Sequence, residues 1–189
     1  MLRKRARGNA IAEELLEREE ELQRHVRRIL EGRMTGLRIR VHGDYHLGQV
    51  LKSGNDFVII DFEGEPSRPL SERRIKRSAL RDVAGMLRSF HYASHALLHG
   101  PHTGVRTEDS EAAGSAAAFW SRWVSVSFLR GYVAESGNAP HLPATREELQ
   151  VLLDVQMLEK ALYEITYELN NRPDWLSIPL RGVLELLGR

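Results

Sequence analysis

Three side chains, Asp44, Gln49 and Asp61, have the types and spacing that transfer of a phosphoryl group requires. That reaction needs a carboxylate that orients the attacking hydroxyl and accepts its proton, and it needs oxygen ligands that hold Mg²⁺ against the phosphates. Asp44 lies in the segment HGDYHLGQ and is the candidate for the base. Gln49 closes that segment, Asp61 follows an apolar run, and these two are the candidate metal ligands.

The residues between Gln49 and Asp61 favour a β-hairpin. Two apolar or β-branched runs, 50–52 and 57–60, flank the turn-forming residues 53–56. A tight turn returns the chain to the same end of the strand pair, so one ion could contact both candidate ligands. Because Asp61 ends an apolar strand, we also expect its carboxylate to lie at a buried edge.

The order of these residues follows the protein-kinase pattern, in which His-x-Asp is followed, after four further residues, by an amide that binds the metal. Asp61-Phe62-Glu63 then stands where kinases place Asp-Phe-Gly. The alternative for Asp44 is a structural role as the cap of a helix or a turn. The matching distances to Gln49 and Asp61 favour catalysis.

Four further polar residues are candidates for supporting roles around this loop. His42 is predicted to brace the loop, and His46 is predicted either to brace it or to contact a phosphate or the base. Asp82 opens a helix and could accept hydrogen bonds from the loop backbone. Glu63 is a candidate for metal or substrate binding.

The remaining elements are predicted to be helices, since apolar residues recur at spacings of three and four. A Thr-Arg-Glu-Glu capping box predicts that one helix begins near Thr145. Phe119, Trp120 and Trp123 are expected in the core, and the basic segment 68–77 is expected to be irregular and solvated. The predicted helices are 9–31, which Gly32 ends, 79–98, 111–135, 145–169 and 178–187, with a short extended run at 37–41 and a loop at 99–110.

The composition fits one ordinary soluble domain, with 189 residues of which 42% are hydrophobic. The 27 basic and 26 acidic residues nearly cancel, so charge argues for neither nucleic acid nor a membrane as a partner. The chain has no cysteine, no apolar signal-peptide core and no apolar run long enough to span a bilayer. We therefore expect a cytoplasmic protein.

Four ordered sequence blocks resemble maltokinase, a member of the superfamily of aminoglycoside phosphotransferases and protein-kinase-like enzymes. The resemblance covers about 37–180, and the blocks are HGDYHLGQVL, DFEGEP, RDVAGMLRSFHYA and YELNNRPDW. It implies Asp44 as the base, Gln49 and Asp61 as Mg²⁺ ligands, ATP as co-substrate, and conversion of maltose to maltose 1-phosphate. It also implies a place in glycogen and trehalose metabolism, where maltokinase is often fused to a trehalose synthase domain.

A second cluster of residues has the composition of a sugar site. Sugar binding uses flat aromatic faces together with charged or amide groups that bond the hydroxyls. The candidates are Tyr167, Glu168, Arg172 and Trp175, with Tyr163 on the same helix face as Tyr167. The resemblance implies that this block forms the disaccharide pocket, and core packing is the alternative.

The sequence thus predicts a mainly α fold with one small β-hairpin, similar to the C-terminal lobe of a protein kinase. Only 43 residues precede Asp44, too few for the sheet-rich lobe that covers ATP, so we expect that N-terminal lobe to be absent. The chain 1–189 is interpreted as a single lobe, a truncation or one half of a split enzyme, that turns over little alone. Its predicted parts are a leading helix at 1–36, the catalytic loop, hairpin and basic loop at 37–77, and a helical subdomain with the sugar pocket at 78–189.

Two other functions stay open. The chain could be a non-catalytic remnant that binds a sugar or a partner protein. Less favoured is a metallohydrolase in which His42, Asp44 and His46 alternate as metal ligands on a strand. The glycines in this segment weaken a regular strand, and that interpretation leaves Asp61 unexplained.

Overall fold

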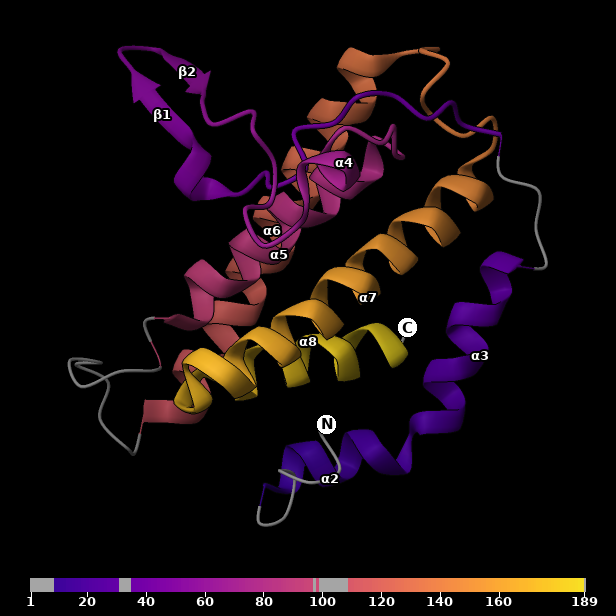
Figure 1. Cartoon of the computed structure of the whole chain (residues 1–189). Coiled ribbons are helices and arrows are strands. Elements are labelled where there is room, and N and C mark those ends of the chain that lie inside the picture. The colour runs from indigo at the N-terminus through magenta and orange to yellow at the C-terminus, as the bar shows by residue number, and fades with distance from the viewer. Residues whose placement is uncertain (1–8, 31–34, 97, 99–108, 189) are drawn as a thin grey trace.

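The computed structural model describes residues 9–30, 35–96, 98 and 109–188. It is mainly helical with a two-stranded antiparallel hairpin, as predicted (Figure 1). The helices are α2 Ala10–Glu17, α3 Glu19–Leu30, α4 Leu70–Arg73, α5 Leu80–Ala96, α6 Ser110–Ser136, α7 Arg146–Asn171 and α8 Ser177–Leu187. The strands are β1 Val50–Ser53 and β2 Asp56–Ile59, and single 3₁₀ turns lie at Leu47–Gln49 and Pro173–Trp175. No helix in the described part of the chain is both long and apolar enough to cross a membrane.

Two apolar clusters hold the helices together. In one, α5 packs between α6 and α7 and contributes Leu80, Val83 and Phe90. In the other, α7 and α8 pack against α2, with Leu158 and Leu180 completely or almost completely buried. Helix α7 takes part in both clusters, so it joins the two halves of the helical body (Figure 1).

The predicted leading helix is wrong as a single element, because the chain bends at Arg18 between α2 and α3. The bend lets α2 bury Ala12 and Leu15 while α3 packs along α7. Val26 of α3 is 41% exposed, so this apolar side chain is not part of the core. Gly32, which was expected to end the helix, lies outside the described residues, as do 99–108 of the predicted loop.

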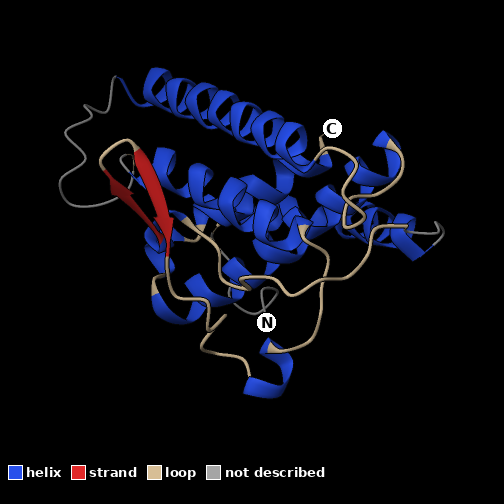
Figure 2. Ribbon diagram, turned by 90° about the horizontal axis from the view of Figure 1, so that it is seen from above, coloured by secondary structure: helices blue, strands red, loops and turns tan. Residues whose placement is uncertain are grey.

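The structure of the hairpin and its surroundings agrees in part with the prediction from the sequence. Val50 pairs with Ile59 and Ser53 with Asp56, and both strands are largely exposed beside the helices (Figure 2). The extended run at 37–41 is reduced to one antiparallel bridge between Ile39 and Arg77. The basic segment is not wholly irregular, because the one-turn helix α4 begins within it at Leu70.

Helix α7 begins with one of the two hydrogen bonds of the predicted capping box. The Thr145 hydroxyl accepts a hydrogen bond from the backbone N–H of Glu148 at 3.1 Å. The Glu148 carboxylate accepts a hydrogen bond from the Thr35 hydroxyl. Glu148 therefore also ties the segment before the loop 42–49 to the start of α7.

The prediction that Phe119, Trp120 and Trp123 lie in the core is wrong. These side chains are 67%, 46% and 53% exposed on α6. Only one side of α6 faces α5, where Phe128 packs edge-on against Phe90. Within the part of the chain that the structure describes, α5 therefore covers only part of the aromatic face of α6.

Gly85 lies where α5 packs closely against the backbone of the loop 42–49. A Cβ atom there would lie 2.6 Å from the Tyr45 carbonyl oxygen. We expect Gly85→Ala to lower the free energy of unfolding by about 1–3 kcal/mol, because loop backbone would have to move. Gly131→Ala on α6 is the matched control, since a Cβ meets nothing within 4 Å and should stabilise by about 0.5–1 kcal/mol. Urea denaturation measures both, and equal stabilisation by the two changes would contradict the expected clash.

Candidate active site

The loop 42–49 is fixed to the start of α5 by Asp82. Its two carboxylate oxygens accept hydrogen bonds from the backbone N–H groups of His42 at 2.7 Å and Gly43 at 2.9 Å. Gly43 has φ = 87°, a conformation that L side chains rarely adopt. Burial raises the pKa of the Asp82 carboxyl, and the bonds from Gly43 and His42 offset this only in part. This is the geometry expected of a residue that holds the loop, and the role itself stays a prediction.

The two loop histidines make different contacts. The buried His42 ring joins the loop to the end of β2, since its Nε2 lies 2.7 Å from the Ile60 carbonyl oxygen. Its Nδ1 lies 3.4 Å from the Asp44 backbone nitrogen, which places the proton on Nε2. His46 accepts a bond from the Gly48 N–H through Nδ1, and its Nε2 lies 3.8 Å from Asp44. Both histidines thus contact the loop backbone, and His46 also faces the candidate base, while their roles stay predictions.

The hairpin brings Gln49 and Asp61 together. The Gln49 side-chain nitrogen donates to the Asp61 carboxylate at 2.9 Å. This bond does not use the amide oxygen or the second carboxylate oxygen, and such oxygens fit a hard cation such as Mg²⁺. The expected buried edge is wrong, because Asp61 is exposed and has φ = 63°. The left-handed conformation turns the chain out of β2, and Glu63 is exposed just after it.

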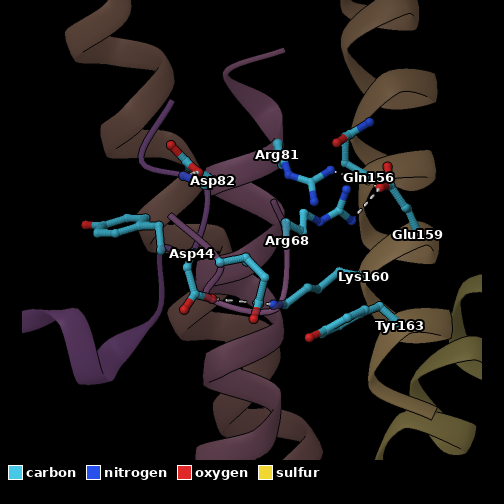
Figure 3. Close-up of a pocket in the computed structure, with 12 residues that line it drawn as sticks. Asp44, Arg68, Arg81, Asp82, Gln156, Glu159, Lys160 and Tyr163 are labelled. Carbon is cyan, nitrogen blue, oxygen red and sulfur yellow. Dashed lines mark hydrogen bonds and ion pairs between the residues drawn. The ribbon is translucent and has the colours of Figure 1, made fainter. Parts of the chain in front are cut away.

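Asp44 lines a pocket formed by the loop, α5 and α7. Its carboxylate lies 3.9 Å from the Lys160 ammonium, and its side chain is 17% exposed (Figure 3). Burial raises the pKa of the Asp44 carboxyl, and the negative charge of Glu65 raises it further. Lys160, His46 and His42 lower that pKa without reversing the shift. A carboxylate with a raised pKa is a better proton acceptor, as a general base requires.

The other side of the pocket carries paired charges. Arg81 donates to the Glu159 carboxylate at 2.9 Å, and Arg68 lies 3.9 Å from it (Figure 3). The Tyr163 ring lies against the Lys160 ammonium, 5.2 Å from centroid to Nζ. The pocket therefore offers cationic groups that donate hydrogen bonds and carboxylates that accept them, and this combination suits a ligand with several hydroxyl groups. The residues that line it are Gly43, Asp44, Tyr45, Glu65, Arg68, Arg81, Asp82, Gly85, Gln156, Glu159, Lys160 and Tyr163.

Most of the α7 lining was not singled out from the sequence. Gln156, Glu159, Lys160 and Tyr163 recur at spacings of three and four, so they form a polar stripe on one helix face. That stripe was the available signal, since a polar face next to a candidate base is a possible pocket wall. Arg68 was assigned to a solvated charge run, whereas it lines the pocket.

The predicted sugar residues form a separate cluster. Glu168 is 1% exposed, accepts two bonds from Arg172 at 2.7 and 3.0 Å, and accepts a third from the Tyr92 hydroxyl. The Arg172 guanidinium lies over the rings of Tyr167 and Trp175, 5.5 and 4.9 Å from their centroids. None of the four predicted residues lines the pocket around Asp44. Their contact with a sugar stays a prediction.

The helical body, the hairpin that joins Gln49 to Asp61 and the pocket around Asp44 are consistent with a kinase-like fragment. No protein-family model matches this chain. Glucosamine kinase of Mycolicibacterium smegmatis (strain ATCC 700084 / mc(2)155) is 30% identical over 186 residues, 95% of this chain and 42% of the relative. Glucosamine kinase of Streptacidiphilus jiangxiensis is 28% identical over 154 residues, 79% of this chain and 32% of the relative.

Solved structures of glucosamine kinase share the fold. Crystal form B has a TM-score of 0.73 at 24% identity and covers 95% of this chain and 41% of its own. A complex with glucosamine, ADP and inorganic phosphate has a TM-score of 0.73 at 24% identity, and covers 95% and 42%. The chain is therefore homologous to glucosamine kinases, and it spans about a third to two fifths of their length. The comparisons support the predicted homology to a sugar kinase, but not to maltokinase in particular.

Proposed function

We propose that this chain forms the acceptor-binding and base-bearing lobe of an ATP-dependent sugar kinase. The observation that carries the proposal is the Asp44 carboxylate, which lies in a pocket and has a raised pKa. Its loop is held at His42 by two hydrogen bonds and at Leu47 by a bond to the Ser89 hydroxyl. The homology to glucosamine kinases supports the same class of reaction. The three predicted parts of the chain, 1–36, 37–77 and 78–189, belong to one lobe in this proposal.

In the proposed reaction, Asp44 accepts the proton of the sugar hydroxyl while the oxygen of that hydroxyl forms a bond to the γ-phosphorus of ATP. The bond from that phosphorus to the bridging oxygen breaks, and ADP leaves. Lys160 offsets the negative charge of Asp44 before the proton arrives, and Asp82 and His42 hold the loop that carries the base. Gln49 and Asp61 would hold Mg²⁺, which neutralises phosphate charge when bound.

We propose an amino sugar such as glucosamine as the acceptor. The relatives are named glucosamine kinases. The pocket is lined by four carboxylates, which suit a cationic amino group: Asp44, Glu65, Asp82 and Glu159. Maltose, predicted from the sequence resemblance, requires contacts from the separate cluster around Arg172. It is the second acceptor to test.

We propose that full turnover requires a second kinase lobe in addition to this chain. A kinase grips the phosphates of ATP with a second, sheet-rich lobe. The chain matches about two fifths of the Mycolicibacterium smegmatis relative. We propose that the contacts with the ATP phosphates are made by the part of a kinase that this chain does not match, and that this part can be supplied as a separate protein. A trehalose synthase domain as partner and a place in the cytoplasm remain predictions.

The decisive experiment combines sugar binding with turnover. Calorimetry with the chain alone should show glucosamine binding tighter than maltose by at least about tenfold, the difference expected from one added charge contact. ATP-dependent phosphorylation is then measured for the chain alone and with the N-terminal lobe of a relative added. Binding without any phosphorylation in either preparation would favour the non-catalytic remnant. Binding of neither sugar would overturn the proposal.

A further inference from the structure

A second cluster of ligand-type side chains lies between α5 and α8. His91 and His95 are one turn apart on α5, and Glu185 faces them from α8. One ligand atom from each residue lies within 4.8 Å of the other two. The two rings stack with centroids 4.2 Å apart, and none of the three residues lines the pocket around Asp44. The proposed kinase reaction gives this cluster no role.

His95 is set up as a nitrogen ligand. Its Nδ1 lies 2.9 Å from the His91 carbonyl oxygen and 3.0 Å from the Ser94 hydroxyl oxygen. The Ser94 hydroxyl itself donates to the same carbonyl at 2.8 Å. These contacts place the proton of the neutral ring on Nδ1, so Nε2 carries the free lone pair, as in histidines that bind metals.

His91 has buried nitrogens that the surrounding side chains do not satisfy. The residue is 6% exposed, and neither ring nitrogen has a hydrogen-bond partner within the described ranges 9–30, 35–96, 98 and 109–188. Its Nε2 lies 3.8 Å from the Glu185 carboxylate, too far for a hydrogen bond. Buried polar groups are nearly always paired, so an orphaned imidazole facing a carboxylate indicates a missing ligand.

The local charges are compatible with a cation. The buried His91 ring faces the Glu185 carboxylate, whose negative charge favours a cation between them. The neighbouring cation is Arg88, whose guanidinium lies 2.7 Å from the Glu164 carboxylate and is therefore largely neutralised. The Glu185 side chain is 51% exposed, which gives an ion a route from solvent.

We propose that His91, His95 and Glu185 bind a divalent transition-metal ion of the Zn²⁺ class that joins α5 to α8. Two imidazoles and one carboxylate favour zinc over Mg²⁺ or Ca²⁺, which take oxygen ligands. Zinc bonds of roughly 2.0–2.1 Å require the three ligand atoms to move closer together. The exposed Glu185 side chain can rotate to achieve this, and water completes the coordination.

Cobalt is the probe, because Co²⁺ takes zinc sites and absorbs visible light when bound by nitrogen and oxygen ligands. The chain contains no cysteine, so such bands cannot come from thiolates. Titration of the tag-free, chelator-treated chain with Co²⁺ should give one set of bands that saturates at one equivalent, and Zn²⁺ should abolish it. Zn²⁺ should also raise the midpoint of thermal unfolding.

Glu185→Gln is the test variant, because a change to this exposed side chain should leave the fold intact. We expect it to weaken Co²⁺ binding at least about tenfold and to remove most of the thermal shift. The matched control is Glu111→Gln on the exposed surface of α6, which should bind like the parent chain. His91→Gln, checked by circular dichroism, should lose the bands in the same way.

Two results would overturn this site. One is the lack of cobalt bands or of a zinc-dependent thermal shift in the parent chain. The other is binding that Asp44→Asn abolishes and Glu185→Gln leaves unchanged, because the ion would then lie at the loop around Asp44. Sugar binding and phosphorylation are measured separately from cobalt binding, so failure of this inference is distinguishable from failure of the proposed kinase function.

Discussion

Asp44→Asn is expected to lower the rate of sugar phosphorylation by about 10²–10⁴-fold, the usual contribution of a general base. Asparagine has the same shape but cannot accept the hydroxyl proton. The fold should persist, because the Asp44 carboxylate is penalised by burial and by the charge of Glu65, and its removal relieves both. The measurement is kcat at saturating ATP and glucosamine, with an N-terminal kinase lobe supplied, beside calorimetric sugar binding.

Asp56→Asn is the matched control for that substitution. Asp56 is an exposed carboxylate at the start of β2, and its side chain accepts a bond from the next backbone N–H, which asparagine retains. We expect kcat within about twofold of the parent, as for surface changes away from the site. If Asp44→Asn left kcat unchanged while Asp56→Asn behaved as expected, Asp44 would be a structural cap and another group would be the base.

The part of the site that the sequence predicted is local in the chain. The turn-forming residues 53–56 and the flanking apolar runs specify the hairpin, and the hairpin alone brings Gln49 to Asp61. The contact of Asp82 with the loop was also expected, although it is not local, because it joins His42 to a residue 40 positions further along the chain. Local rules failed at Asp61, because an apolar strand next to it was taken as a sign of burial, whereas both strands are exposed.

The rest of the pocket depends on contacts between distant segments. Lys160 reaches Asp44 across more than a hundred residues, and no propensity or motif states that α7 crosses this loop. The same limit explains the error at Trp120 and Trp123, since their burial depends on what covers α6 rather than on their own type. Helical periodicity shows that a face is apolar, but it does not identify the partner of that face.

Glu164→Ala is expected to lower the free energy of unfolding by about 3–5 kcal/mol, the largest stability effect predicted for this chain. Glu164 on α7 pairs with Arg88 on α5 at 2.7 and 2.9 Å, and the Arg88 side chain is 2% exposed. Truncation would leave a guanidinium buried without its counter-ion between the two helices that form the pocket walls. Chemical denaturation measures the loss, and circular dichroism in the absence of denaturant shows whether the fold survives.

Two further variants separate this pair from an ordinary surface contact. Glu72→Ala removes the partially exposed partner of Arg68, 3.7 Å away, and should change stability by at most about 1 kcal/mol. The double change Arg88→Met with Glu164→Leu removes both charges and should recover much of the loss, because no buried ion remains. If the double variant were no more stable than Glu164→Ala, the loss would arise from packing around α5 and α7, and the uncompensated charge of Arg88 would not be its cause.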